Sequence, residues 1–282
     1  MILFKKVSDL KKFVEAQRLM GKSIGFSPTM GALHSGHMAL LHTSQAQCDI
    51  SIVSIFVNPT QFNDPEDLKK YPRTEGNDLA MLDKEGCDVV FMPGVDDIYP
   101  KNLPETPKLD LEGLDKVMEG AFRPGHFDGV VQVVKRLLDI VAPDKLYMGQ
   151  KDFQQFTIIN FMIEQYKLPV ELVVVPIVRE DSGLAKSSRN VRLSEAAKQK
   201  ATSIFQQLSG LRAALEKFSP KEVETKFLKA LEIAGLEPEY LCIVNGKTLQ
   251  PVSDFSKESY VVACTAAWIE GVRLIDNMIL KQ

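Results

Sequence analysis

The sequence is poor in cysteine, in histidine and in long hydrophobic runs. Its 282 residues include only four cysteines and four histidines. Cys48, Cys87, Cys242 and Cys264 are far apart and form no Cys-x-x-Cys pair, which argues against zinc or disulfides and favours buried free thiols in a reducing compartment. The apolar runs are far shorter than the roughly 20 residues that span a bilayer, and the N-terminus is too polar for a signal peptide. We therefore predict a cytoplasmic protein.

An excess of charge of one sign is also lacking. The net charge is −3, and basic and acidic residues are interspersed. Because nucleic acids and anionic membranes are bound by broad basic surfaces, this balance argues against both partners. It leaves room for a small anionic substrate, which a few local cations can hold. The hydrophobic fraction of 45% is typical of a globular protein with a sizeable core.

Over its first 178 residues the sequence alternates β-rich and helical segments. The β-rich segments are 23–26, 49–57, 87–93, 145–149 and 170–178. The helical segments are 36–47, 74–85, 129–141 and 152–166. This order predicts an α/β fold with a doubly wound parallel sheet, in which ligands bind at the carboxyl ends of the strands near a topological switch point.

The character of the sequence changes after about residue 178. Two helical segments follow, at 194–218 and 219–235, with serine at each N-terminus. Three strand candidates close the chain, at 239–244, 259–267 and 272–276. Helices beside an antiparallel sheet predict a second, smaller α+β domain.

Three of the four histidines lie where the first predicted strand turns into a helix, in SPTMGALHSGHMALLH. His34 and His37 flank the start of that helix, whose free N–H groups and dipole attract phosphate. Two imidazoles there can donate to phosphate oxygens during phosphoryl or adenylyl transfer. The alternative is a pair of solvated or capping histidines, and we favour the phosphate-binding interpretation. His42 is assigned to the helix and not to a site.

A second candidate is the segment GLAKSSRN at 183–190. Lys186 and Arg189 supply positive charge, and Ser187 and Ser188 supply hydroxyls for phosphate oxygens. Alone it is also compatible with an exposed basic loop. Together with the histidine pair, it predicts a site that binds both ends of a triphosphate.

A third candidate, GQKDFQQF, follows the fourth predicted strand. Gly149 permits a tight turn, and Lys151 would stand at a helix N-terminus. Asp152 is either a helix cap or a site residue. Of Gln154 and Gln155, at most one is expected to face the cleft.

Two further segments carry neutral or mixed polar groups. Asn58 and Gln61, after the second buried strand, offer amides that bind a polar substrate without adding charge. The residues that follow form either a mobile lid or, as fits 63–70 well, an ordinary surface loop. Arg123 and His126 flank Pro-Gly before a helix, and we favour a turn there over a substrate contact.

These blocks together resemble the pantothenate synthetase, or pantoate–β-alanine ligase, family. In order they are PTMGALHSGH, SIFVNPTQF, YPRT, RPGHFDGVV, GQKDFQQ, GLAKSSRN and RLIDN. The histidine and SSRN blocks occur more widely among HxGH nucleotidyltransferases, whereas NPTQF, RPGHFDG and KDFQQ are particular to this family. The resemblance covers nearly the whole chain.

The resemblance implies a Rossmann-like domain over 1–177 that binds nucleotide and pantoate, with a smaller α+β lid domain over 178–282. It implies a cytoplasmic homodimer in pantothenate and coenzyme A biosynthesis that uses ATP with Mg²⁺. Pantoate would react with ATP to give pantoyl adenylate and pyrophosphate, and β-alanine would then displace AMP to give pantothenate.

The resemblance also implies residue roles. Catalysis would depend on His34, His37 and Lys151. The ATP-binding set would be Met30, His34, His37, Gly149, Lys151, Asp152, Val178, Lys186, Ser187, Ser188 and Arg189. Gln61, Gln155 and Asn58 would bind substrate. The Mg²⁺ ligands stay undetermined, with Asp78 and Asp152 as options.

Three other functions stay open on the sequence. A nucleotidylyltransferase would use the same phosphate-binding groups and keep AMP in its product. A tRNA synthetase is disfavoured because the C-terminal part, of about 100 residues, is small and not strongly basic. A catalytically dead nucleotide-binding protein is disfavoured because the candidate positions hold chemically competent residues.

Overall fold

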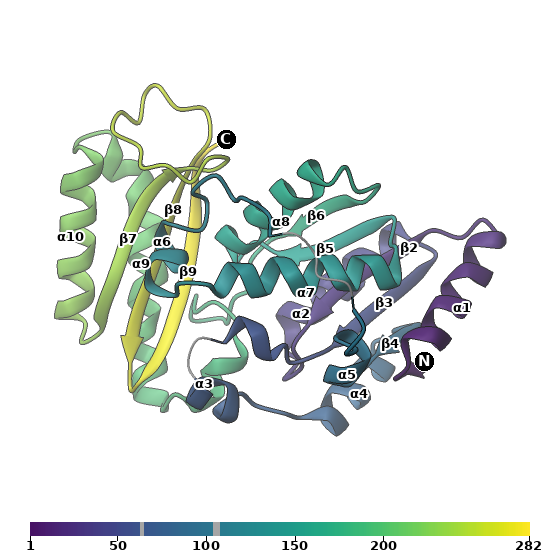
Figure 1. Cartoon of the computed structure of the whole chain (residues 1–282). Coiled ribbons are helices and arrows are strands. Elements are labelled where there is room, and N and C mark those ends of the chain that lie inside the picture. The colour runs from purple at the N-terminus through teal and green to yellow at the C-terminus, as the bar shows by residue number, and fades with distance from the viewer. Residues whose placement is uncertain (63–64, 104–107) are drawn as a thin grey trace.

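The N-terminal part of the chain is a parallel sheet with helices on both faces (Figure 1). The computed structural model describes residues 1–62, 65–103 and 108–282. The strands are β1 (Ile2–Phe4), β2 (Ile24–Thr29), β3 (Ile50–Ile55), β4 (Val89–Phe91), β5 (Lys145–Gly149) and β6 (Glu171–Val175). Their order is β1-β4-β3-β2-β5-β6, and every pair is parallel. The predicted doubly wound α/β fold is confirmed.

The central strands of the sheet are buried on both faces, because their side chains alternate between two helical layers. The helices are α1 (Val7–Leu19), α2 (Ser35–Gln47), α3 (Pro65–Lys70), α4 (Glu75–Lys84), α5 (Val95–Ile98), α6 (Met118–Phe122), α7 (His126–Val141) and α8 (Phe153–Gln165), with a 3₁₀ turn η1 (Pro59–Gln61). On β3, Ile52 belongs to the core formed with α1, α7 and α8. Its neighbour Val53 belongs to the core formed with α2 and α4. This alternation explains the continuous apolar run of β3.

The N-terminal strand and helix were not predicted from the sequence. Ile2 and Leu3 of β1 are exposed at the edge of the sheet, where they pair with β4. A three-residue strand with exposed side chains has no periodic pattern, so only its tertiary partner identifies it. The predicted helix at 129–141 also begins earlier, at His126, because Gly125 takes a left-handed conformation (φ +80°) just before it.

The C-terminal part is a three-stranded antiparallel sheet backed by two helices, as predicted. A 3₁₀ turn η2 (Ser188–Arg192) leads to α9 (Glu195–Leu215), α10 (Pro220–Ile233), β7 (Glu237–Asn245), β8 (Val261–Ile269) and β9 (Val272–Lys281). Ser194 and Ser219 cap α9 and α10 through bonds to backbone N–H groups.

The C-terminal sheet packs on both sides. Leu241 and Ile243 join the core with α9 and α10. Tyr240 and Val262 join the core of the N-terminal sheet. Because one core continues across both parts, the boundary at 177/178 stays a prediction.

Two expectations from the composition, on the state of the cysteines and on membrane-spanning segments, can be compared with the structure. All four cysteines are free thiols; Cys87 and Cys264 are buried as predicted, whereas Cys48 and Cys242 are only partly buried. Across the described ranges, none of the helices is both long and apolar enough to cross a membrane.

Candidate functional site

A cavity of about 210 Å³ lies at the carboxyl ends of β2 and β5. These neighbouring strands form the switch point of the sheet, because the chain continues from β2 to β3 on one side and from β5 to β6 on the other. All fourteen predicted site residues line it. They are Met30, His34, His37, Asn58, Gln61, Gly149, Lys151, Asp152, Gln155, Val178, Lys186, Ser187, Ser188 and Arg189. The fold thus brings together segments from four parts of the chain.

The turn between β2 and α2 is held by a buried carboxylate. Gly31 (φ +80°) and Ala32 (φ +48°) are left-handed, so the backbone N–H groups of Ala32 and Leu33 point toward α4. There the Asp78 carboxylate accepts a hydrogen bond from each of these N–H groups, at 2.9 and 2.8 Å. Asp78 is 2% exposed. It sets the direction in which the chain enters α2 and therefore the position of His34.

The two imidazoles have defined tautomers. The rings of His34 and His37 lie 4.1 Å apart. Nδ1 of His34 accepts from the Gly36 N–H at 3.1 Å, and Nδ1 of His37 accepts from the His34 N–H at 3.3 Å. In the neutral rings, each proton is therefore on Nε2.

Both imidazoles are neutral at physiological pH. Burial, and next the charge of Lys151, lower the pKa of His34 to about 4. Burial, and next the proximity of His34, lower the pKa of His37 to about 3. The pair therefore presents Nε2–H hydrogen-bond donors rather than positive charges.

The turn after β5 supplies the charged pair of the cavity. Lys151 Nζ lies 3.8 Å from an Asp152 oxygen. Asp152 occupies the N-cap position of α8, yet its side chain makes no capping bond. Of the two roles considered for Asp152, the capping bond is therefore not formed, and the site role stays a prediction.

The GLAKSSRN segment closes the cavity from the C-terminal part. Ser187 Oγ accepts from the Arg189 N–H at 3.3 Å, which starts η2. The Arg189 guanidinium pairs with Asp67 of α3 at 3.1 Å and lies over the Tyr71 ring. Lys186 pairs with Glu180 at 3.5 Å. Of the stretch considered as a lid or surface loop, residues 65–70 form α3, and residues 63–64 lie outside the described ranges.

The amide residues are held by the start of α7. His126 donates from Nδ1 to the Gln61 carbonyl at 2.7 Å, and Asn58 donates to the Gly129 carbonyl at 3.1 Å. A side chain at Gly129 would collide with the Thr60 carbonyl. The RPGHFDG block at the start of α7 therefore packs directly against the NPTQ turn and fixes its position. Since Asn58 is 1% exposed and bonded to several protein groups, its amide is already committed within the protein.

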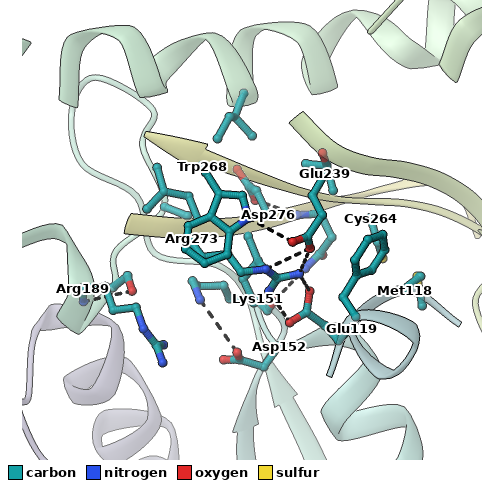
Figure 2. A pocket seen from close by; sticks show the side chains of 18 of the residues that line it. Met118, Glu119, Lys151, Asp152, Arg189, Glu239, Cys264, Trp268, Arg273 and Asp276 are labelled. Carbon is teal, nitrogen blue, oxygen red and sulfur yellow. Dashed lines mark hydrogen bonds and ion pairs between the residues drawn. The ribbon is translucent and has the colours of Figure 1, made fainter. Parts of the chain in front are cut away.

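A second cavity, of about 430 Å³, continues the first between the two parts of the chain (Figure 2). Lys151, Asp152 and Arg189 line both. On its wall, Arg273 donates to both oxygens of Glu119 at 2.6 and 2.8 Å and also pairs with Glu239. This ion cluster joins α6 to the C-terminal sheet.

The sequence reasoning missed several residues at the cleft. Tyr71 of the YPRT block lines the smaller cavity. So does one face of α7, formed by Val130, Val133, Val134 and Leu137. Apolar spacing identified α7 as a core helix, but spacing alone does not tell a core face from an apolar cavity wall.

The described residues include no group of three or more His, Cys, Asp or Glu side chains arranged to hold a metal ion. The Asp78 carboxylate accepts bonds from Ala32, Leu33 and Thr74. It is thus committed to the turn before His34. Asp152 is the better placed of the two carboxylates considered for Mg²⁺, because it lines the cavity beside Lys151.

The parallel sheet, its switch-point cleft and the donors gathered there define the class: a nucleotide-binding α/β enzyme with a C-terminal domain beside its cleft. The chain belongs to the pantoate–β-alanine ligase family, whose model matches residues 2–279.

Relatives of known name agree along the full length. The chain is 46% identical over 279 residues to a pantothenate synthetase of Porphyromonas gingivalis W83, covering 99% of each. It is 46% identical over 277 residues to one from Bacteroides thetaiotaomicron, covering 98% of each.

Solved structures agree as well. A crystal structure of pantothenate synthetase from Thermus thermophilus matches with a TM-score of 0.92, at 37% identity and 100% coverage of both chains. A pantoate–β-alanine ligase from Francisella tularensis, solved with β-γ ATP and β-alanine, matches with a TM-score of 0.81, at 33% identity, covering 99% of this chain and 98% of that one. The predicted family and ligase activity are confirmed, and the nucleotidylyltransferase alternative is not favoured.

Proposed function

We propose that this chain condenses pantoate with β-alanine to pantothenate at the expense of ATP, through a pantoyl-adenylate intermediate. The observation that carries the proposal is the convergence of His34, His37, Lys151 and the serine–arginine loop on one cavity. The family membership and the ligand-bound Francisella relative support it.

The chemistry needs no nucleophile from the protein. An oxygen of the pantoate carboxylate attacks the α-phosphorus of ATP, the bond to the bridging oxygen breaks, and pyrophosphate leaves. The amine of β-alanine then attacks the acyl carbon, loses a proton, and the bond to AMP breaks. The protein contributes by holding the reactants in line and by stabilising phosphate charge.

We propose that phosphate is held from two sides. His34 and His37 donate from Nε2–H at the α2 terminus, and Lys151 adds a positive charge. Ser187, Ser188 and Arg189 donate from the opposite wall. Neutral imidazoles fit this role, because donation to a phosphoryl oxygen needs an N–H and not a charge.

We propose that pantoate lies between the amides and the apolar face of α7. Gln61 and Gln155 hold its polar groups, and Val130 and Val134 contact its hydrocarbon. Asn58 acts by orienting Gln61, since its amide donates to Gln61 Oε1 at 3.3 Å. Met30, Gly149 and Val178 complete the nucleotide side of the cavity.

Mg²⁺ would enter as the MgATP complex, with Asp152 as a protein carboxylate near the phosphates. Mg²⁺ commonly takes one or two carboxylates together with substrate phosphates and water. The absence of a three-ligand cluster among the described residues is compatible with such binding. A homodimer and a cytoplasmic location are further proposals, testable by light scattering and by cell fractionation.

The test is incubation with ATP, pantoate and β-alanine, followed by chromatography of the products. We expect equal amounts of pantothenate, AMP and pyrophosphate, with free AMP only when the amine is present. Recovery of AMP joined covalently to a stable product would contradict the ligase and favour the nucleotidylyltransferase. The absence of ATP-dependent pyrophosphate release with a panel of carboxylic acids would favour a non-catalytic nucleotide-binding protein.

A further inference from the structure

Apart from Arg273, the RLIDN block has no role so far, although it lies on β9 at the junction of the two parts of the chain. Its last two residues, Asp276 and Asn277, are 5% and 2% exposed. Both line the cavity between the two parts (Figure 2 labels Asp276 and Lys151). A buried carboxylate and a buried amide are costly unless their hydrogen bonds are satisfied, so their partners show what they do.

The partners of Asn277 belong to the turn that carries Lys151. The side-chain amide of Asn277 donates to the carbonyl oxygens of Gln150 and Lys151, both at 2.9 Å. Its Oδ1 accepts from the Gln150 side chain at 3.1 Å. One side chain thus satisfies two consecutive carbonyls of the turn between β5 and α8. The backbone of Lys151 is held from the C-terminal sheet.

The partners of Asp276 belong to the segment that leads to the serine–arginine loop. Its carboxylate accepts hydrogen bonds from both terminal nitrogens of Arg179, at 2.6 and 2.9 Å. Arg179 also donates to the Gly183 carbonyl at 3.1 Å and lies 4.1 Å over the Phe205 ring. These contacts fix the hairpin of residues 179–185, directly before Lys186.

Two consecutive residues of β9 therefore hold both elements that face the phosphates. Asn277 holds the turn of Lys151, and Asp276 holds the loop of Ser187 and Arg189 through Arg179. Because strand neighbours have a fixed separation, this dipeptide sets the distance between the two elements. A paired guanidinium and a doubly donating amide make both attachments rigid.

We propose that Asp276 and Asn277 form a positioning pair that aligns Lys151 with the serine–arginine loop for the phosphates of ATP. Neither residue touches the reacting atoms. The proposal rests on the proposed function, in which both elements bind ATP phosphates. It adds that the C-terminal sheet contributes to catalysis through these two residues.

The decisive variant is Asn277→Asp, which keeps the shape of the side chain and turns its donor into an acceptor. The carboxylate would face two carbonyl oxygens at about the distance of the lost bonds. We expect kcat to fall about 10- to 100-fold and the affinity for a non-hydrolysable ATP analogue to fall about tenfold. KM for β-alanine should stay within about twofold, because the turn contacts phosphate.

The matched control is Asn245→Asp in β7 of the same sheet. Asn245 donates to Glu258 at 2.6 Å and lines neither cavity. The same chemical change there should lower stability and leave kcat unchanged. An equal loss of kcat in both variants would mean that the effect is general destabilisation of the sheet, and would overturn the proposal.

A double-mutant cycle separates positioning from an independent effect. Added to Lys151→Ala, Asn277→Asp should reduce kcat by less than about threefold, because the residue acts through Lys151. If the two losses in kcat multiply in the double variant, the proposal is overturned. Wild-type kcat and ATP affinity in Asn277→Asp would also overturn it. If Asn277→Asp does not fold, Asn277→Ser, which can still donate to one carbonyl, is to show an intermediate loss.

Failure of the proposed function would be distinguishable from failure of the positioning proposal. Wild-type protein that binds the ATP analogue but makes no pantothenate would refute the ligase assignment. Analogue affinity, measured by calorimetry in Asn277→Asp and Asn245→Asp, would still decide whether Asn277 positions the nucleotide site.

Discussion

At the scale of single residues, His34 and His37 are oriented by the main chain. Two backbone N–H groups occupy their Nδ1 atoms, so both Nε2–H groups remain as donors. Burial keeps both rings neutral. Lys151, at 20% side-chain exposure, supplies the charge that the imidazoles do not.

We expect His37→Ala and Lys151→Ala to fold and to lose about 10²-fold or more in kcat, because each removes a group aimed at phosphate charge. The measurements are steady-state kinetics and far-UV circular dichroism. His42→Ala is the matched control, since His42 lies on the same helix but pairs with Glu85 on the surface. Wild-type turnover in either site variant would remove that residue from the mechanism.

The lowered pKa values of the two histidines predict a pH-dependent stability. Unfolded histidine titrates near pH ~6.5, so between about 6.5 and 4 the unfolded chain binds protons that the folded protein does not. The free energy of unfolding should therefore decrease as the pH falls through this window. At pH ~5, about 1.5 units below the pKa of unfolded histidine, each neutral ring accounts for about 2 kcal/mol, so the pair accounts for about 4 kcal/mol at most.

Urea titrations at pH 7 and pH 5 measure this loss. The double variant His34→Gln/His37→Gln should lose less stability than the wild type between the two values. His126, whose pKa burial and the charge of Arg123 lower to about 4, remains in both proteins and contributes equally. Identical losses would show that the histidine pair does not titrate as described.

At the scale of elements, the turns after the strands are held by groups distant in sequence. Asp78 of α4 holds the turn after β2, and the start of α7 holds the turn after β3. Asn277 holds the turn after β5. Each link places cleft residues by fixing their backbone, so substitutions behind the cleft should affect activity.

Asp78→Asn tests this for the histidine turn. An amide N–H₂ facing the N–H of Ala32 or Leu33 would repel it and lose one of the two bonds. We expect a loss of about 1–3 kcal/mol in unfolding free energy and about tenfold in kcat/KM for ATP. Thr74→Val, which removes only the hydroxyl that donates to Asp78 at 3.0 Å, should have a smaller effect on both. A destabilised Asp78→Asn with unchanged kcat/KM would mean that the turn does not position His34.

At the scale of the whole molecule, the two parts of the chain are joined by buried charge as well as by apolar contacts. Glu119, Arg273 and Glu239 are 13%, 15% and 15% exposed in their side chains. Burial would raise the pKa of Glu119, but its hydrogen bonds to Arg273 outweigh this and hold the pKa below its usual range. The cluster fixes α6 to the C-terminal sheet at the wall of the larger cavity, which Arg189 also lines.

Arg273→Met should therefore destabilise the protein by about 3–5 kcal/mol, because it leaves two largely buried carboxylates without their cationic partner. Among the described residues, Glu119 then keeps only the hydrogen bond from Tyr240, and Glu239 only that from Trp268. Adding Glu119→Gln should restore part of the loss, since one buried charge is then gone. Thermal or urea unfolding measures both. Additive losses in the double variant would show that Glu119 and Arg273 do not depend on each other.

Local sequence patterns determined the alternation of strands and helices, the parallel sheet and the cleft at its switch point. They also identified the residues around the cavity, because glycine turns, helix starts and clustered polar groups after strands are short-range signals. Motif resemblance supplied the family. All fourteen predicted residues line one cavity. Met30 and Val178 were predicted from the motif resemblance alone, and the individual roles of the fourteen are predictions.

Tertiary structure decided what short-range signals do not contain. Only the fold pairs β1 with β4, commits Asn58 and Asp78 to protein partners, and brings Asn277 to the Lys151 turn. The physical reason is that the identity of a polar side chain does not specify its hydrogen-bond partner. That partner depends on which elements pack together. Periodicity and turn chemistry act over a few residues, whereas the contact that holds the Lys151 turn joins positions 127 residues apart.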